Sequence, residues 1–135
     1  MTLVVDASLV VAALVDSGPT GTWAEEKLGS GHLAAPHLMP VEAASILRRA
    51  ALAGEVSVDT ASMAHEDLLA LRVELFPYGP FAARVWALRT NVTAHDAWYV
   101  ALAESLDAKL ATLDRRVARA SGCRCGFLTP PELMA

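Results

Sequence analysis

The sequence predicts an α/β fold, in which a mostly parallel β-sheet is covered by helices on both faces. Short apolar runs, several of them rich in β-branched residues, alternate along the chain with longer segments of helical periodicity. Strands that alternate with helices are typical of parallel sheets, because each crossover helix packs back onto the sheet. The length of 135 residues suits one domain, and we expect residues 1–135 to form a single unit.

The first predicted element is a buried strand over residues 2–5, which stops at Asp6 and is followed by an apolar helix over 8–15. Glycine, proline and small polar residues then separate each element from the next. The remaining expected elements are a helix capped by Thr20 and ended by Gly29, a strand at 32–35, a helix from Pro40 to about residue 53, a helix opened by Ser57, a strand at 73–76, a helix after Gly79-Pro80, a helix over 94–106, a strand at 109–112, a helix over 114–120 and a strand at 125–128.

The composition is unusually apolar, with 54% hydrophobic and only 19% charged residues. A surplus of this kind predicts that a partner or a second copy covers part of the surface. The apolar run at 7–15 is far shorter than the ~20 residues that cross a bilayer. Asp6 also interrupts any signal peptide, so we expect a cytoplasmic protein.

Charge and cysteine content exclude two classes of site. With 15 acidic and 11 Lys or Arg residues, the chain is unsuited to holding nucleic acid by a basic surface alone, although bound cations would still allow contact with phosphates. Cys123 and Cys125 are too close in sequence for an unstrained disulfide, and two thiols do not complete a structural zinc site. The four histidines lack the HxxxH and HxH spacings. We therefore expect reduced thiols and no zinc.

Four carboxylates stand at junctions between predicted elements. Asp6 and Asp114 directly follow strands, whereas Glu42 and Asp96 fall in the first turns of apolar helices. Each one alone is explained by helix capping or by the helix dipole, and Thr93 with Asp96 matches a capping box. Together they predict a site, because a parallel sheet brings junctions of the same kind to its carboxyl edge.

Carboxylates gathered at one edge require positive charge between them. At ~4 Å, two like charges repel by about 4 kcal/mol at an effective dielectric of 20. Magnesium, or manganese in its place, prefers such oxygen ligands. An acidic magnesium site without a side-chain nucleophile predicts that metal-activated water attacks a phosphodiester. Ser8 and Thr112 would orient the ligands, or serve only as capping and strand-end hydroxyls.

Several other side chains are candidates for contact with RNA. Arg48 and Arg49 lie on the helix that carries Glu42, and Arg115 follows Asp114, so these arginines would bind phosphates unless they only form solvated faces. The aromatic residues at 98 and 99 would either stack on bases or pack in the core.

These residues carry a family resemblance along essentially the whole chain. The opening Val4-Val5-Asp6-Ala7-Ser8 resembles that of PIN-domain nucleases. Three later stretches resemble, in order and spacing, the VapC toxins of VapBC (type II) toxin–antitoxin systems. They are Pro36-His37-Leu38 with Glu42 and Ile46-Leu47-Arg48-Arg49, then Thr93-Ala94-His95-Asp96-Ala97-Trp98-Tyr99-Val100-Ala101-Leu102-Ala103, and finally Ala111-Thr112-Leu113-Asp114-Arg115-Arg116.

The resemblance implies a PIN-like three-layer α/β/α sandwich with a five-stranded sheet, and a Mg²⁺- or Mn²⁺-dependent endoribonuclease. It also implies inhibition by a VapB-type antitoxin, and commonly a homodimer. The family's metal-binding acids fall on Asp6, Glu42, Asp96 and Asp114, with Thr112 as the neighbouring hydroxyl. These are the same four acids that stand at the junctions between predicted strands and helices.

The chain departs from the family pattern at two positions without losing a ligand. His95 stands where relatives often carry a bulkier side chain, and Ser45 where they often carry asparagine. His95 would tune the pH dependence or simply pack at the surface.

Other classes fit less well. A haloacid-dehalogenase-type phosphatase needs an aspartate where Ser8 stands, and a response-regulator receiver needs an acidic pair and a lysine that are not evident. A catalytically idle PIN fold that binds RNA or protein is the remaining alternative.

Overall fold

The computed structural model describes residues 1–131, and its five-stranded sheet is parallel throughout. The strands lie in the order β3-β2-β1-β4-β5, so β1 is central and has neighbours on both sides. Their bounds are Thr2–Val5 for β1, His32–Pro36 for β2, Glu74–Phe76 for β3, Lys109–Ala111 for β4 and Phe127–Leu128 for β5.

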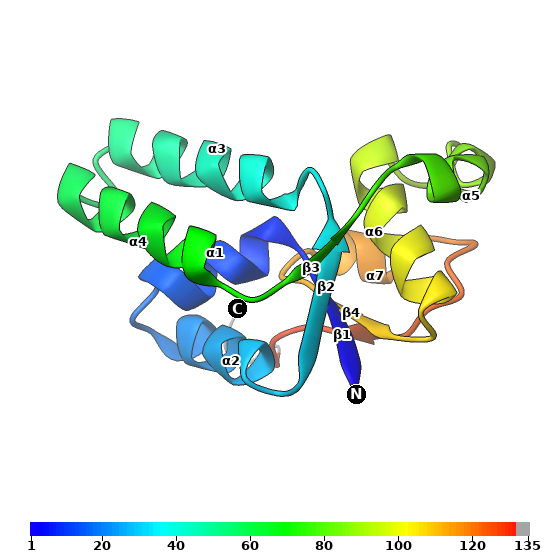
Figure 1. Ribbon diagram of the computed structural model, residues 1–135, viewed down its shortest axis with the longest axis horizontal. Helices are drawn as coiled ribbons and strands as arrows, with labels where there is room; N and C mark the ends of the chain where they lie inside the picture. The colour runs from blue at the N-terminus through cyan, green and yellow to red at the C-terminus, as the bar shows by residue number, and fades with distance from the viewer. Residues whose placement is uncertain (132–135) are drawn as a thin grey trace.

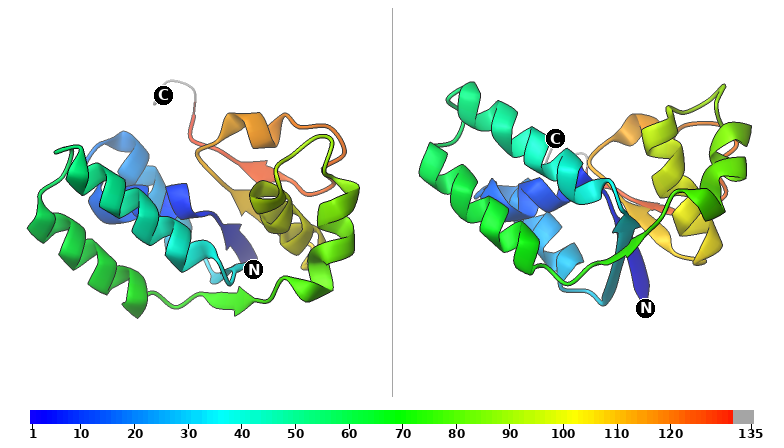
Figure 2. Two further views of the ribbon diagram at one scale, coloured as in Figure 1. Left: turned by 90° about the horizontal axis from the view of Figure 1, so that it is seen from above. Right: turned by 45° about the horizontal axis from the view of Figure 1, so that its top comes forward.

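Helices cover both faces of this sheet, as the sequence predicts. The first four helices lie on one face, and the others lie on the opposite face (Figures 1 and 2). The result is a three-layer α/β/α sandwich. The helices are α1 (Ala7–Val15), α2 (Pro19–Leu28), α3 (Met39–Leu52), α4 (Val58–Ala70), α5 (Ala82–Ala87), α6 (Ala94–Ser105) and α7 (Arg115–Ala118), and a 3₁₀ turn, η1 (Gly79–Phe81), precedes α5.

The core forms where the central strand meets the two most apolar helices. Leu3, Val4 and Val5 of β1 are buried because helices cover both faces of the sheet at this strand. On one side α1 contributes five buried residues between Leu9 and Ala13. On the other side α6 packs against β1, β2 and β4 through a nearly unbroken buried segment from Ala97 to Ala103.

The strand order leaves a crevice at the carboxyl ends of β1 and β4. From β1 the chain builds β2 and β3 outward on one side, and then returns through α6 to build β4 and β5 on the other side. Such a reversal is a topological switch point, where the loops after neighbouring strands diverge and open α/β sheets bind ligands. The fold therefore places the residues that follow β1 and β4 in the walls of this crevice.

Several predicted boundaries are wrong by a few residues. Thr20 does not cap α2, which begins at Pro19 because proline fits the first helical position, and Gly18 is the cap. The edge strands β3 and β5 are shorter than predicted, since each pairs with a neighbour on one side only. Cys125 lies outside β5, and it and Cys123 are free thiols.

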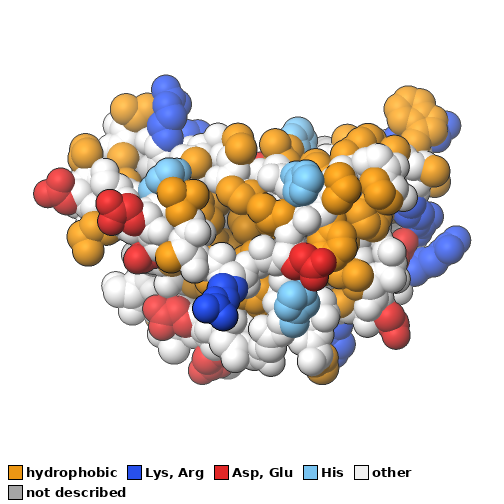
Figure 3. All heavy atoms as spheres, viewed as in Figure 1, with side chains coloured by type: hydrophobic (Ala, Val, Ile, Leu, Met, Phe, Trp, Pro, Cys, Tyr) orange, Lys and Arg blue, Asp and Glu red, His pale blue; other side chains and the backbone are white. Residues whose placement is uncertain are grey.

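Part of the hydrophobic surplus lies at the surface. Figure 3 shows apolar side chains grouped on one face, between the α3–α4 pair and α5. Five of the nine large hydrophobic side chains that are exposed among residues 1–131 belong to α3 and α4, namely Val41, Leu52, Val58, Met63 and Leu69. Within this part of the chain, no helix has the length and apolar character needed to cross a membrane.

The close packing of α1 against α2 yields a first prediction. A Cβ added at Gly21 would lie 1.7 Å from the backbone oxygen of Asp16, which a side-chain movement cannot relieve. We expect Gly21→Ala to lower the free energy of unfolding by about 1–3 kcal/mol, measured by urea titration.

Gly29→Ala, at the opposite end of the same helix, is the control, because its added Cβ would meet its nearest atoms at 3.7 Å. We expect a change within about 0.5 kcal/mol for this variant. Equal urea midpoints for Gly21→Ala and the parent would contradict the packing described here.

Candidate active site

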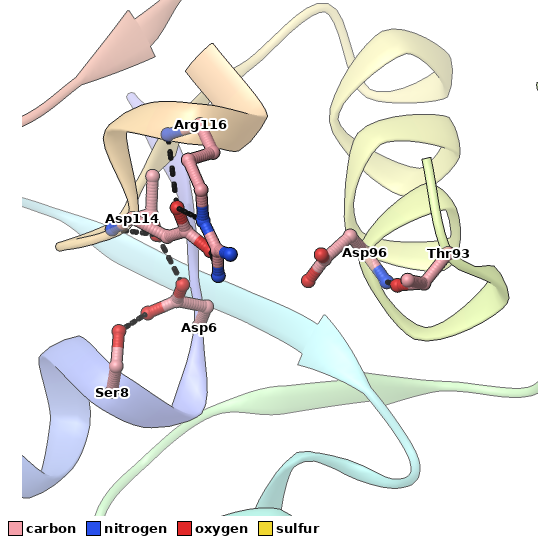
Figure 4. Close-up of polar contacts among 7 residues, drawn as sticks. Asp6, Ser8, Thr93, Asp96, Asp114 and Arg116 are labelled. Atoms are coloured by element: carbon pink, nitrogen blue, oxygen red, sulfur yellow. Dashed lines mark hydrogen bonds and ion pairs between the residues drawn. The ribbon is translucent and has the colours of Figure 1, made fainter. Parts of the chain in front are cut away.

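Asp6 is held at the crevice by the pairing of β1 with β4. Because Val5 pairs with Ala111, the residues that follow these two strands lie side by side, and the Thr112 hydroxyl donates to Oδ2 of Asp6. Oδ1 accepts from the Ser8 hydroxyl at 2.8 Å and from the Leu9 N–H at 3.0 Å (Figure 4). Asp6 thus caps α1, and three donors fix its carboxylate.

Thr112 joins Asp6 to Asp114. Its side chain is 1% exposed, and its hydroxyl oxygen accepts from the Asp114 N–H at 2.9 Å while its proton goes to Asp6. Asp114 in turn caps α7, because its Oδ1 accepts from the Arg116 N–H at 2.9 Å. A single buried hydroxyl therefore sets the spacing of the two acids that follow β1 and β4.

Glu42 is held from the opposite helix layer. Tyr99, buried on α6, donates its hydroxyl to Oε1 of Glu42 at 2.7 Å and so links α6 to the first turn of α3. Burial and the hydrogen bond to Glu42 raise the pKa of Tyr99, so the phenol keeps its proton. Sequence reasoning left this tyrosine between the core and base stacking. The core assignment is right, and the contact with Glu42 was missed.

Asp96 faces the other acids from the start of α6. Its N–H donates to the Thr93 hydroxyl at 3.3 Å, and its carboxylate points toward Asp114 (Figure 4). Burial, and then the charge of Asp114, raise the pKa of Asp96. Burial also raises the pKa of Asp6, to which the charge of Asp96 contributes. The negative charges therefore act on one another across the crevice.

Asp114 differs from Asp6 and Asp96 because it has a cationic partner. The guanidinium of Arg116 reaches both carboxylate oxygens, with Nε 3.3 Å from Oδ1 and Nη2 3.2 Å from Oδ2. These hydrogen bonds lower the pKa of Asp114. Among residues 1–131, this is the one ion pair that any of the four acids forms.

The three arginines that were predicted from the sequence to bind RNA phosphates lie in different places. Arg49 lines the pocket beside the acids. Arg48 instead lines a groove between α3 and α4, because the next residue on a helix points about 100° away. Arg115 donates to the carbonyl of Pro130. Arg116 was not among the predicted site residues. Its position two residues after a capping aspartate could have indicated that it lies near the acids.

A pocket of about 410 Å³ opens between α3 and the start of α6. This volume falls in the range of small-molecule and cofactor sites. Its polar lining is Asp6, Ser8, Glu42, Ser45, Arg49, His95, Asp96 and Tyr99. Asp96 also lines a smaller cavity of about 220 Å³ together with Arg116, the residue that pairs with Asp114.

The donor set suits a hard divalent cation. Within the described residues 1–131, no three acidic, histidine or cysteine side chains form a closed metal cage. Magnesium does not require one, because it keeps several waters and binds through one or two carboxylates. Carboxylates with neighbouring hydroxyls, and thiols that lie elsewhere, match magnesium or manganese better than zinc.

Comparison with known proteins identifies the family to which this fold belongs. The model of the PIN domain family matches residues 3–122. Ribonuclease VapC1 of Mycobacterium tuberculosis is 42% identical over 123 residues, which are 90% of this chain and 92% of that protein. Ribonuclease VapC9 of the same organism is 35% identical over 130 residues, which cover 96% of this chain and 99% of the relative.

Solved structures share the fold at lower sequence identity. PAE2754 from Pyrobaculum aerophilum has a TM-score of 0.71 and 23% identity, and the match covers 94% of this chain and 83% of that one. VapBC2 from Rickettsia felis, bound to a DNA fragment from their promoter, has a TM-score of 0.66 and 13% identity, with 96% and 98% covered. Because the family model spans most of the chain and the two relatives are 35–42% identical over nearly their whole length, this protein belongs to the PIN-domain family, with VapC ribonucleases among its relatives.

Proposed function

We propose that this chain is a metal-dependent endoribonuclease of the VapC type, which cuts RNA phosphodiester bonds and is neutralised by a VapB-type antitoxin. The observation that carries the proposal is the acidic pocket at the switch point, with Asp6, Glu42 and Asp96 in its lining and Asp114 joined to Asp6 through Thr112. The identity to proteins named ribonucleases supports the choice of RNA as substrate. We further propose that the protein acts in the cytoplasm.

Asp6, Glu42, Asp96 and Asp114 are the residues that would hold Mg²⁺ or, in its place, Mn²⁺. Burial and mutual repulsion raise the pKa of Asp6 and Asp96, which is expected of carboxylates suited to a positive ligand. When bound, the cation would supply Lewis-acid stabilisation of the phosphate and a water acidic enough to attack near neutral pH.

The protein's own contribution is to keep the acids in place. Thr112 and Ser8 donate to opposite oxygens of Asp6, so its carboxylate has little rotational freedom. Tyr99 engages Oε1 of Glu42. Arg49, at the pocket, would bind an RNA phosphate on the approach to the acids.

The partner proposal rests on the surface of α3 and α4. Five large hydrophobic side chains are exposed there, an arrangement that favours contact with another protein. We propose that this apolar surface contacts the antitoxin and a second copy of the chain in a homodimer. A binding module without catalysis would present the same surface, so only the chemistry separates the two functions.

Asp96→Asn tests the catalytic role of the acids. We expect the rate of cleavage of total cellular RNA to fall by at least about a hundredfold, because even residues that only orient metal ligands are worth 10- to 100-fold. The circular dichroism spectrum and antitoxin binding should stay unchanged. Asp67→Asn, the same change at an exposed site on α4, is the control and should cut RNA like the parent.

An Asp96→Asn variant as active as the parent would show that the mechanism is wrong. A parent protein that binds RNA but cuts none of it with any divalent metal would point to the idle binding module instead.

Metal removal gives an independent prediction. Treatment with EDTA should stop cleavage, and an excess of Mg²⁺ or Mn²⁺ should restore it, as followed by the appearance of discrete fragments on a denaturing gel. Zn²⁺ should not substitute, because the pocket lining offers three carboxylates but a single imidazole and no thiol. Cleavage that survives EDTA would overturn the assignment of a metal-dependent reaction.

A further inference from the structure

Arg116 is the cation closest to the candidate metal ligands. Its guanidinium meets Asp114 with two donors on two oxygens, in the planar fork geometry that arginine also uses for phosphate. Figure 4 shows the guanidinium on the side of Asp114 that faces Asp96. The positive charge of Arg116 also acts on Asp96, whose pKa it lowers against the larger effect of burial. Arg116 therefore offsets the charge of two of the four acids.

The ion pair is easily exchanged for other contacts. The Arg116 side chain is 91% exposed, whereas that of Asp114 is 30% exposed, so the arginine can leave without uncovering a core. Exposed ion pairs contribute little to stability, because water solvates both groups when they separate. The backbone N–H of Arg116 still bonds Oδ1 of Asp114 at 2.9 Å, so the aspartate keeps its position as the cap of α7.

Neighbouring arginines are less suited to the same role. Arg115 is engaged by the carbonyl of Pro130, which ties the segment after β5 to α7. Arg119, one turn further along, follows the last residue of α7, and within residues 1–131 it forms no ion pair with the four acids. Arg116 alone on this short helix combines exposure with a bond to a candidate ligand.

We propose that Arg116 is an exchangeable counter-ion, which neutralises Asp114 in the free protein and binds an RNA phosphate when a divalent cation takes over that carboxylate. The inference rests on the proposed function and deepens it, because it names a residue that holds the substrate backbone. The guanidinium loses a carboxylate and gains a phosphate, so its two donors remain satisfied throughout. The same residue thereby competes with the metal and assists the RNA.

These two roles predict opposite effects of a single substitution. Arg116→Met removes the charge and the donors but keeps the length of the side chain. Without RNA, we expect the dissociation constant for Mn²⁺ to fall by about two- to fivefold, because an exposed cation no longer competes with the metal for Asp114. Titration calorimetry on the metal-free protein measures this constant. At saturating Mn²⁺, we expect kcat/KM for a labelled single-stranded RNA to fall by about tenfold or more.

The salt dependence identifies the lost contact as one with phosphate. In Arg116→Met, the slope of log KM against log KCl concentration should shrink by about 0.7, the value for one phosphate contact on a single strand. Arg116→Lys should keep most of the slope and lose part of kcat/KM, since lysine carries the charge without the fork. Arg119→Met, the control, removes one charge from the same helix end and should change none of the three quantities.

The outcomes separate this inference from the proposed function. If the parent binds Mn²⁺ and cuts RNA while Arg116→Met matches Arg119→Met in all three quantities, the counter-ion role is wrong and the nuclease stands. Weaker Mn²⁺ binding in Arg116→Met would also overturn the proposal, because the arginine would then support the metal site instead of competing for it. A parent that neither binds Mn²⁺ nor cuts RNA would remove the proposed function itself.

Discussion

The parallel pairing of β1 with β4 is the constraint on which the site depends. It aligns Val5 with Ala111, so Asp6 and Thr112 leave the sheet side by side at the switch point. Thr112 then bonds both Asp6 and the N–H of Asp114. Since every strand is parallel, the connections that carry the other acids return to the same edge. A change of one residue in this register would turn the hydroxyl of Thr112 away from Asp6.

The cost of this arrangement is electrostatic, and it falls unevenly on the acids. Asp114 is relieved by Arg116, and the Tyr99 hydroxyl bonds Glu42, but Asp6 and Asp96 carry raised pKa values because burial disfavours their charged forms. A neutral hydrogen bond contributes only about 0.5–1.5 kcal/mol to stability. Two carboxylates at ~4 Å repel by about 4 kcal/mol at an effective dielectric of 20. Hydroxyls alone therefore do not balance the site, whereas a divalent cation would do so and would also supply the chemistry that we propose.

The fold and the junction acids were predictable because they follow from local patterns. The apolar run that stops at Asp6, and the capping position of Asp96, are visible within a few residues. Contacts between distant side chains were not visible. Tyr99 meets Glu42 across 57 residues of sequence, and Arg115 turns to Pro130 instead of toward a phosphate. Such directions depend on how helices pack, which the periodicity of one segment does not specify.

Thermal unfolding of the metal-free protein, compared with Asp96→Asn, tests the central claim that uncompensated carboxylate charge is what prepares this site for a cation. Burial and Asp114 raise the pKa of Asp96, so its ionised form destabilises the folded state at neutral pH. We therefore predict a higher unfolding midpoint for Asp96→Asn without metal, and a larger gain for the parent on adding Mn²⁺. A lower midpoint for the variant without metal, with equal gains from Mn²⁺, would contradict the account.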